Sequence, residues 1–267
     1  MQKEKKYLVE QRLEAVVKSQ SCQNFSELAL KMTHKISPKF EEEIITAITT
    51  NETSFFRDKH PFETFRDHLL PVFVQLVKKR KLMNQRRGPR VNIWSAASST
   101  GQEPYCLAMD IHKYITTPPT KGVVLGDFRI LATDISSEVL SQAMSGKYNA
   151  LEISRGISEE QKNRYFHAYG KSWGISEEIK GMVEFRKVNL MVPFAFLGSY
   201  DLILCRNVLI YFDEESSRRI ISQFYRMMSN DSVLMLGSSE NLPFQAKEFE
   251  RLEFNNTRYY KKSKPDT

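Results

Sequence analysis

Residues 91–115, VNIWSAASSTGQEPYCLAMDIHKYI, place three kinds of pattern in a row. VNIWSAA is typical of a buried strand, SSTGQEP of a loop, and YCLAMDIHKYI of an amphipathic helix. Further strands are predicted in FRILATDIS, MVEFRKVNL, YDLILCRNVLIYF and SVLMLGSSENL, with helices between them, and FERLEFNNTRYYKK is typical of a closing antiparallel pair. This alternation predicts an α/β fold with a doubly wound, mostly parallel sheet over residues 91–267.

The residues before this domain are predicted to be helical. SPKFEEEIITAI begins with Ser37 as a cap and a proline in the first turn, and its apolar residues recur at helical spacing. We predict a small all-α domain over residues 1–70 and a linker over 71–90 that contains the basic run KKRKLMNQRRGPR. A helix beginning near Pro61 should bend or break at Pro71.

Composition narrows the class of protein. The chain has 267 residues, 41% apolar and 27% charged, which is an ordinary globular balance. No apolar run approaches the roughly 20 residues of a membrane helix, and the N-terminus lacks an apolar signal core, so we expect a cytoplasmic protein without membrane insertion. Its three scattered cysteines predict reduced core thiols and no metal site.

The formal net charge of +7 has two interpretations. The basic run is either a solvated linker or a patch that binds nucleic acid or an acidic protein surface. No aromatic residue is interleaved in it to stack on bases, which weakens the nucleic-acid interpretation.

In a parallel sheet, ligands bind beyond the carboxyl ends of the strands. SSTGQEP lacks the glycine patterns that bind a pyrophosphate or a phosphate chain. Asp134 follows the second strand, where an acid typically binds adenosine ribose hydroxyls, although it fits a helix cap equally well. An acid without a phosphate motif favours an adenosine cofactor that lacks phosphates, and S-adenosyl-L-methionine has that chemistry.

Polar residues also follow the next two strands. Asn189 and Leu190 end the third, and Arg206, Asn207 and Tyr211 follow the fourth. An Asn at a strand end can be a turn residue. An Arg-Asn pair inside an apolar run is harder to explain by structure alone.

The stretch TNETSFFRDKHPF, residues 50–62, fits neither helix nor strand patterning. Together with IWSAASSTGQEPYCLAM, ATDIS, VNL, LCRNVLIYF and LGSSENL, in that order, it resembles the chemotaxis receptor methyltransferase family, CheR, over nearly the whole chain. The resemblance implies a small helical domain followed by a Rossmann-like, S-adenosylmethionine-dependent methyltransferase domain. It also implies methyl transfer to the γ-carboxylate of glutamates on chemoreceptor cytoplasmic helices, with S-adenosyl-L-homocysteine as product.

The resemblance also implies the site residues. Arg57 and Tyr211 match the pair nearest the transferred methyl and are the catalytic candidates. The segment 50–62 would join the two domains and close over the cofactor, with its two phenylalanines between them. The cofactor contacts fall on Asn51, Thr53, Arg57, Glu103, Asp134, Asn189, Leu190, Arg206 and Asn207.

The chain departs from the family pattern in three places. Gln102-Glu103 replaces a pair of acids, and the first helix of the family is expected to be short or missing. The family inserts a β-subdomain between the second and third strands, here reduced and expected at about 165–188. Because its glycines are isolated, we expect no dependence on a tether to a receptor C-terminal peptide, and we expect a monomer.

The chemistry needs no general base, because a glutamate with a pKa near 4.3 is already an anion at neutral pH. Two alternatives remain. One is a catalytically silent receptor-binding module, which retention of the site residues disfavours. The other is a nucleic-acid methyltransferase, which would carry an Asn/Asp-Pro-Pro-aromatic string where this chain has RNVLIY. The basic residues expected to face an acidic receptor are Arg12, Lys18, Lys31, Lys35 and Lys78 to Lys81.

Overall fold

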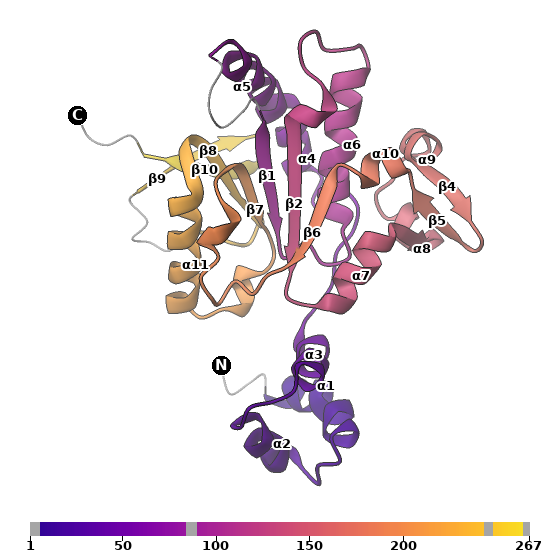
Figure 1. Ribbon diagram of the computed structural model, residues 1–267, viewed down its shortest axis with the longest axis vertical. Helices are drawn as coiled ribbons and strands as arrows, with labels where there is room; N and C mark the ends of the chain where they lie inside the picture. Colours follow the sequence, from indigo (N-terminus) through magenta and orange to yellow (C-terminus); the bar gives the residue numbers. More distant parts are fainter. Residues whose placement is uncertain (1–5, 84–89, 243–247, 264–267) are drawn as a thin grey trace.

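The computed structural model describes residues 6–83, 90–242 and 248–263 and centres on a 7-stranded sheet (Figure 1). Five strands run parallel in the order β6, β2, β1, β7 and β8, and β10 and β9 follow in antiparallel pairing. This confirms the α/β fold with a mostly parallel sheet. The strands are β1 Val91–Ala96, β2 Phe128–Asp134, β6 Val183–Lys187, β7 Tyr200–Cys205, β8 Met228–Leu236, β9 Phe249–Phe254 and β10 Thr257–Lys262.

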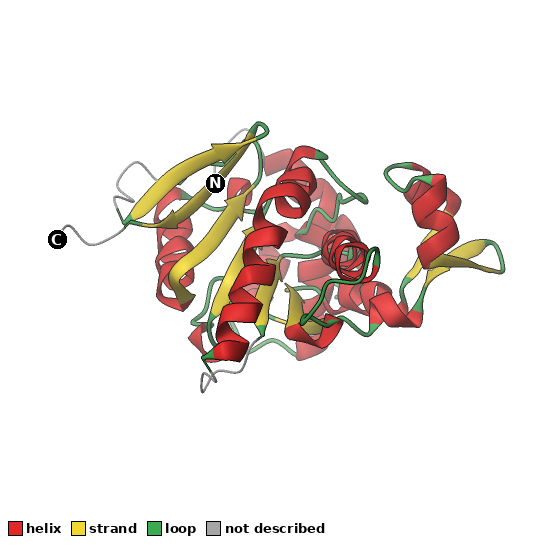
Figure 2. Ribbon diagram, turned by 90° about the horizontal axis from the view of Figure 1, so that it is seen from above, coloured by secondary structure: helices red, strands yellow, loops and turns green. Residues whose placement is uncertain are grey.

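Helices cover both faces of the sheet (Figure 2), so the central strands are buried on both sides. On β1, Ile93 belongs to the core beneath α6, whereas the next residue, Trp94, packs against Phe224 of α11 with ring centroids 5.2 Å apart. All residues of β7 are buried, as expected for a central parallel strand. The covering helices include α6 Gln102–Thr116, α7 Ser137–Ser145 and α11 Glu214–Met227, and short 3-10 turns lie at η3 Leu125–Asp127, η4 Ala195–Leu197 and η5 Leu209–Tyr211.

The N-terminal helices form a bundle beyond one edge of the sheet (Figure 1), and they have their own small apolar core. They are α1 Lys6–Ser19, α2 Phe25–Met32 and α3 Pro38–Ile48. Ser37 caps α3 as predicted, since its side chain accepts a hydrogen bond from Phe40 N at 3.2 Å. Glu42 on α3 touches the α/β domain, accepting hydrogen bonds from Ser137 N at 2.5 Å and from Lys187 Nζ.

The structure differs from the linker predicted over residues 71–90. A continuous helical path runs through α4 His60–Thr64, the π-helical turn η2 Phe65–Leu69 and α5 Leu70–Leu82, and its apolar stripe is buried in the main core. Pro71 does not break the path: it follows directly on the π-helical turn, in which the N–H of Leu70 bonds to the carbonyl of Phe65, so the irregularity in the helix lies just before the proline. Residues 84–89 lie outside the described part.

The basic run hid this helix in the sequence, because Lys78 to Lys81 interrupt its apolar spacing. Two of these charges pair with buried acids near the amino ends of the strands. Arg80 forms a two-pronged ion pair with Asp201 at 2.5 and 3.1 Å, and Lys81 Nζ lies 2.6 Å from Asp127. Arg80 and Lys81 are therefore part of the scaffold of the sheet.

The inserted β-subdomain is a 3-stranded antiparallel sheet in the order β3, β5, β4. It differs from the predicted bounds of 165–188 at both ends. Residues 183–187 form β6 of the main sheet. The first strand of the subdomain, β3, lies well before residue 165. With only three residues, β3 is too short to show the two-residue alternation of a strand in the sequence. Its elements are β3 Lys147–Asn149, α8 Ala150–Ser154, α9 Glu159–Tyr165, β4 Phe166–Tyr169, β5 Ser172–Ile175 and α10 Glu177–Lys180.

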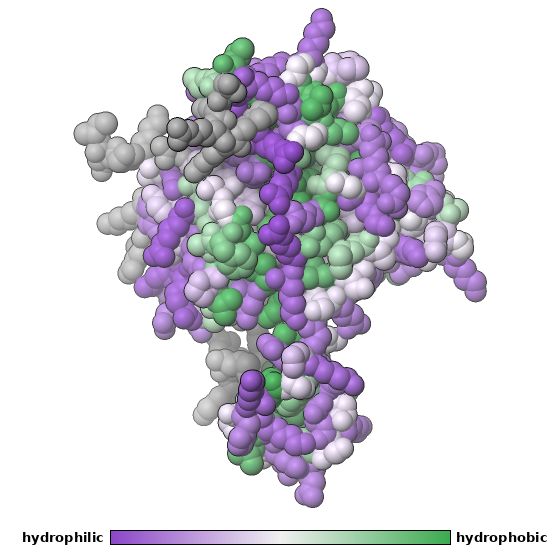
Figure 3. All heavy atoms as spheres, viewed as in Figure 1, coloured by the Kyte–Doolittle hydropathy of each residue, from purple (hydrophilic) through white to green (hydrophobic). Residues whose placement is uncertain are grey.

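Within the described residues, no helix combines the length and apolar character needed to cross a membrane. Polar residues cover most of the face in Figure 3, with apolar residues in smaller patches between them.

Asp110 on α6 is a buried acid whose environment predicts an unusual pH dependence. It is 4% exposed, its Oδ2 has no hydrogen-bond partner among the described residues, and burial raises its pKa to about 7. In the unfolded chain an Asp titrates near 3.9. Between about pH 4 and 7 the folded state therefore holds the extra proton, and stability falls as pH rises through this window.

We expect Asp110→Asn to raise the free energy of unfolding at pH 8 by about 1–3 kcal/mol, because it removes a buried unpaired charge. The gain should shrink toward pH 5, where the wild-type carboxyl is protonated. Urea unfolding at the two pH values measures it, with Asp231→Asn, an exposed site, as control. A gain that does not change with pH would contradict the assignment.

Candidate functional site

The candidate site lies at the carboxyl ends of β1, β2, β6 and β7, the edge of the sheet that faces the helical bundle (Figure 1). The segment between α3 and α4, residues 49–59, runs along this edge. Ser99, in the loop after β1, donates a hydrogen bond from Oγ to the carbonyl of Asn51 at 3.1 Å. Topology thus brings the predicted strand-end residues together with residues 51–58, called here the NETSFFRD segment.

Arg206 is the centre of this edge, and its side chain is only 2% exposed. One terminal nitrogen donates to Glu103 Oε2 at 2.8 Å. The other donates to Asp58 Oδ2 at 2.8 Å and to the carbonyl of Arg57 at 3.0 Å. Glu103 also accepts from Ser95 Oγ at 2.8 Å. The guanidinium therefore ties β7, β1, α6 and the NETSFFRD segment together.

The NETSFFRD segment is held in a sharply bent path. Phe56, Asp58 and Lys59 have positive φ angles of 50°, 67° and 52°, a region in which side-chain-bearing residues are strained. The carbonyl of Arg57 bends inward to Arg206, as described above. The side chain of Arg57 is half-buried, and its Nη1 donates a hydrogen bond to the carbonyl of Glu52 at 2.7 Å. Within the described residues, no carboxylate pairs with this guanidinium.

The prediction that the two phenylalanines pack between the helical domain and the α/β domain is wrong. Phe55, 1% exposed, packs edge-on against Tyr148 and Phe166 of the β-subdomain, at 4.8 and 5.6 Å. Phe56 meets Phe62 at 5.2 Å. Both rings belong to the main core because the left-handed residues turn the segment back toward α4 and α6.

Asp134 lies at the end of β2 and is 7% exposed. Its two oxygens accept hydrogen bonds from Ser99 N at 2.9 Å and Ser136 N at 3.0 Å. Burial raises the pKa of this carboxyl, and the backbone hydrogen bonds oppose that shift. The N-cap of α7 is Ser136, so the helix-cap interpretation of Asp134 is wrong. A carboxylate has about four acceptor positions, so these bonds leave acceptor capacity for a ligand.

The remaining predicted residues lie on neighbouring loops. Asn189 Oδ1 accepts from Met191 N at 2.8 Å, and Leu190 is buried. Asn207 adopts a left-handed conformation with φ of 58°. Tyr211 is 58% exposed, and its side chain makes no hydrogen bond or ring contact among the described residues. Thr53 is half-buried in the same segment as Arg57.

Sequence reasoning missed several residues that build this site: Asp58, Ser95, Ser99 and Glu240. Asp58 is part of the motif TNETSFFRDKHPF and Glu240 is part of LGSSENL, so both residues lie in strings that indicated the family resemblance. Their partners lie 148 and about 30 residues away along the chain, which no local pattern reveals.

The loop after β1 fits an adenosine cofactor. Gly101 has a φ of 92°, and a Cβ on it would come within 2.9 Å of Ala143 Cβ, so the backbone here approaches α7 closely. Ser98 Oγ in the same loop is buried without a hydrogen-bond partner among the described residues. Free acceptor positions on Asp134 suit ribose hydroxyls, and the amide of Asn207 suits a polar ring edge. No group of three or more His, Cys, Asp and Glu in the described ranges is arranged to hold a metal ion.

Residues 51–258 match the family model described as "CheR methyltransferase, SAM binding domain". The chain belongs to the CheR methyltransferase family. Its cofactor is S-adenosylmethionine, and the family resemblance found in the motifs is confirmed. Its activity is S-adenosylmethionine-dependent methylation in chemotaxis.

The relatives cover most of the chain. Chemotaxis protein methyltransferase 1 of Pseudomonas aeruginosa is 38% identical over 243 residues, which are 90% of this chain and 84% of the relative. The chemotaxis protein methyltransferase of Vibrio parahaemolyticus is 36% identical over 258 residues, 96% of this chain and 89% of the relative. Among solved structures, a TehB-like SAM-dependent methyltransferase from Corynebacterium glutamicum is 12% identical, with a TM-score of 0.38, over 72% of this chain and 87% of that one.

Replacing Arg206 should damage the whole edge of the sheet. We expect Arg206→Met to lower the free energy of unfolding by about 3 kcal/mol, because Glu103, whose side chain is 13% exposed, and the more exposed Asp58 lose the cation that they share. Urea unfolding measures the change. Arg129→Met is the matched control: its ion pair with Glu184 is exposed, with side chains 50% and 38% accessible, so the loss there should stay below about 1 kcal/mol. Equal losses in the two variants would contradict the central role of Arg206.

Proposed function

We propose that this protein transfers the methyl group of S-adenosylmethionine to the γ-carboxylate of glutamates on the cytoplasmic helices of chemoreceptors. The observation that carries the proposal is the placement of Arg57 within a chain of this family. Its carbonyl is fixed by Arg206, while its guanidinium has no carboxylate partner among the described residues. A cation held in place without a counter-charge, beside the strand ends, suits an incoming carboxylate.

The cofactor would be held by the polar residues of the strand ends. It supplies an electrophilic methyl group on a positively charged sulfur. Asp134 is proposed to accept hydrogen bonds from the ribose, and Asn189, Leu190 and Asn207 to contact the base. Asn51, Thr53, Glu103 and Arg206 complete the proposed contacts, with Glu103 and Arg206 acting partly through the ion pairs that shape the site.

Arg57 and Tyr211 are the proposed catalytic pair. Because a glutamate carboxylate is already ionised near neutral pH, the residues need not remove a proton. Their work is to orient the carboxylate and exclude water, and alignment of this kind contributes up to about 7–11 kcal/mol in well-oriented models. Tyr211 is exposed on η5 and is available to a substrate helix that lies across the site.

The helical domain is the proposed receptor-facing surface. Of its basic candidates, Arg12 donates to the carbonyl of Ile48 and to Thr50 Oγ1, both at 2.9 Å, so it anchors the chain just before the site. Lys18 lies 3.7 Å from Glu14 in an exposed pair, and Lys31 donates to the carbonyl of Gln20. An acidic receptor helix would compete with these weak surface contacts.

We further propose that the protein acts as a cytoplasmic monomer on protein and not on nucleic acid. We also propose that it needs no tether to a receptor C-terminal peptide. The β4–β5 turn is short, spanning Gly170 and Lys171, and Lys147 Nζ lies 3.8 Å above the Tyr169 ring beside it. This compact hairpin supports the tether-independent interpretation.

Arg57→Ala should lower methyl transfer to a receptor cytoplasmic fragment by about 100-fold or more, because a charge-assisted contact to the carboxylate is lost. Unfolding free energy should change by less than about 1 kcal/mol, since the side chain is partly exposed. The assay follows labelled methyl that is released by base. Arg251→Ala, an exposed arginine on β9, is the matched control.

Two results would contradict the proposal. An Arg57→Ala variant with wild-type turnover would remove Arg57 from the reaction. A wild-type protein that binds cofactor but forms no base-labile methyl would favour the catalytically silent receptor-binding module.

Removing the C-terminal peptide of a receptor should leave its methylation rate within about two-fold, because no tethering contact is lost. Parallel assays on full-length and truncated receptors measure this. A ten-fold or larger loss on truncation would show that the β-subdomain is a tethering site after all.

A further inference from the structure

Glu240, just after β8, has a carboxylate that is surrounded by backbone N–H groups. The residue is 5% exposed. Oε2 accepts from Asn207 N and from Gly237 N, both at 2.7 Å. Oε1 accepts from Val208 N at 2.9 Å and from Ile210 N at 3.3 Å. A single side chain thus satisfies three amides of the loop that follows β7.

The N–H groups of that loop need acceptors from outside the loop, because its backbone is irregular. Asn207 is left-handed, and the loop then makes a single 3-10 turn at η5, so successive N–H groups are not paired along a helix or a strand. Buried amides without an acceptor cost about 1–3 kcal/mol each. A charged acceptor binds them about twice as strongly as a neutral one.

Gly237 allows the end of β8 to approach this loop. A Cβ on Gly237 would come within 2.6 Å of Glu240 Oε2 and 2.8 Å of Asn207 N, distances that real Cβ atoms do not adopt. The strand end, the carboxylate and the loop therefore form one closely packed unit.

We infer that Glu240 is a positioning residue for methyl transfer. Its carboxylate fixes the segment 207–211, which presents Asn207 to the cofactor and Tyr211 to the substrate. The inference rests on the proposed function of those two residues. Glu240 itself touches neither reactant; it acts through the backbone that it binds.

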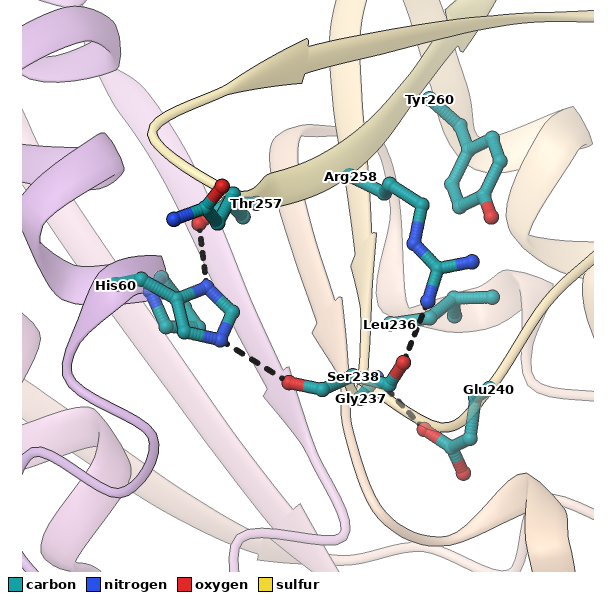
Figure 4. Close-up of a pocket in the computed structure, with 10 residues that line it drawn as sticks. His60, Leu236, Gly237, Ser238, Glu240, Thr257, Arg258 and Tyr260 are labelled. Carbon is teal, nitrogen blue, oxygen red and sulfur yellow. Dashed lines mark hydrogen bonds between the residues drawn. The ribbon is translucent and has the colours of Figure 1, made fainter.

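The neighbouring cavity provides a way to test this. Glu240 lines a cavity of about 60 Å³ together with His60, Ser238, Thr257 and Arg258 (Figure 4). A single water needs about 10–15 Å³, so the cavity is large enough to admit a formate ion. In Glu240→Ala, formate could reach the vacated position and accept the same four N–H groups.

Methylation of a chemoreceptor cytoplasmic fragment by Glu240→Ala is the experiment. We expect kcat to fall about 10–100-fold, as loss of a charge-assisted hydrogen bond predicts, while KM for the fragment changes less than about two-fold. Formate should restore at least about ten-fold of kcat, and chloride at equal ionic strength should not.

Asp127→Ala is the matched control. Asp127 is also 5% exposed, and its carboxylate accepts a hydrogen bond from the backbone N–H of Val124 at 2.8 Å. It lies just before β2, at the opposite end of the strands from the candidate site. It should lose stability and keep wild-type kcat when assayed folded. If Glu240→Ala behaves in the same way, or if formate restores stability without restoring kcat, the inference is overturned.

Gly237→Ala tests the same unit should Glu240→Ala not fold. Its methyl group forces the carboxylate or Asn207 to shift, so kcat should fall in the same direction. A folded Gly237→Ala protein with wild-type kcat overturns this inference and leaves the proposed function intact. A wild-type protein that transfers no methyl overturns the proposed function and this inference together.

Discussion

The buried guanidinium of Arg206 is the interaction on which the candidate site depends. It lies at the end of a fully buried strand and binds two carboxylates and one carbonyl, which come from α6 and from the segment before α4. Its two terminal nitrogens make these three contacts, whereas the buried Nε has no partner among the described residues, so the ion depends on these acceptors to offset its lost hydration. The NETSFFRD segment must therefore stay in its bent path, because it supplies two of those acceptors.

This requirement explains the strain next to it. Left-handed backbone at residues such as Phe56 and Asp58 costs about 1–3 kcal/mol per position, and it persists only where surrounding contacts determine it. Here the contacts are the ion pairs to Arg206 on one side and the edge-on packing of Phe55 on the other. These contacts hold the segment beside the strand ends, with the guanidinium of Arg57 bonded to the carbonyl of Glu52.

The regular part of the fold was predictable from local pattern, and the irregular part was not. Strands such as β7 and β1 are short apolar runs bounded by loop residues, so period and length suffice to find them. The helix α5 was missed because Lys78 to Lys81 obscure its stripe, although Arg80 and Lys81 serve buried acids. The three-residue β3 exists only because β5 pairs with it, and nothing within residues 147–149 indicates this.

The site divides in the same way. Topology alone places Asp134, Asn189 and Arg206 at one edge, since carboxyl ends of parallel strands meet there. What each side chain binds depends on contacts between distant segments, such as Arg206 with Asp58 or Glu240 with Asn207. Those contacts are set by backbone turns whose angles no spacing of residues encodes.

The contact of Glu42 with the end of the sheet joins the helical domain to the α/β domain. Its carboxylate meets Ser137 and Lys187, which stand three residues after Asp134 and two before Asn189. If the helical domain binds the receptor as proposed, a receptor helix that shifts this domain would alter the surroundings of the proposed cofactor contacts. By the reciprocity of coupled binding, the cofactor would then change receptor affinity by the same factor. A protein of this design would respond to its two ligands jointly, so the methyl donor would act as a regulator of docking as well as a reactant.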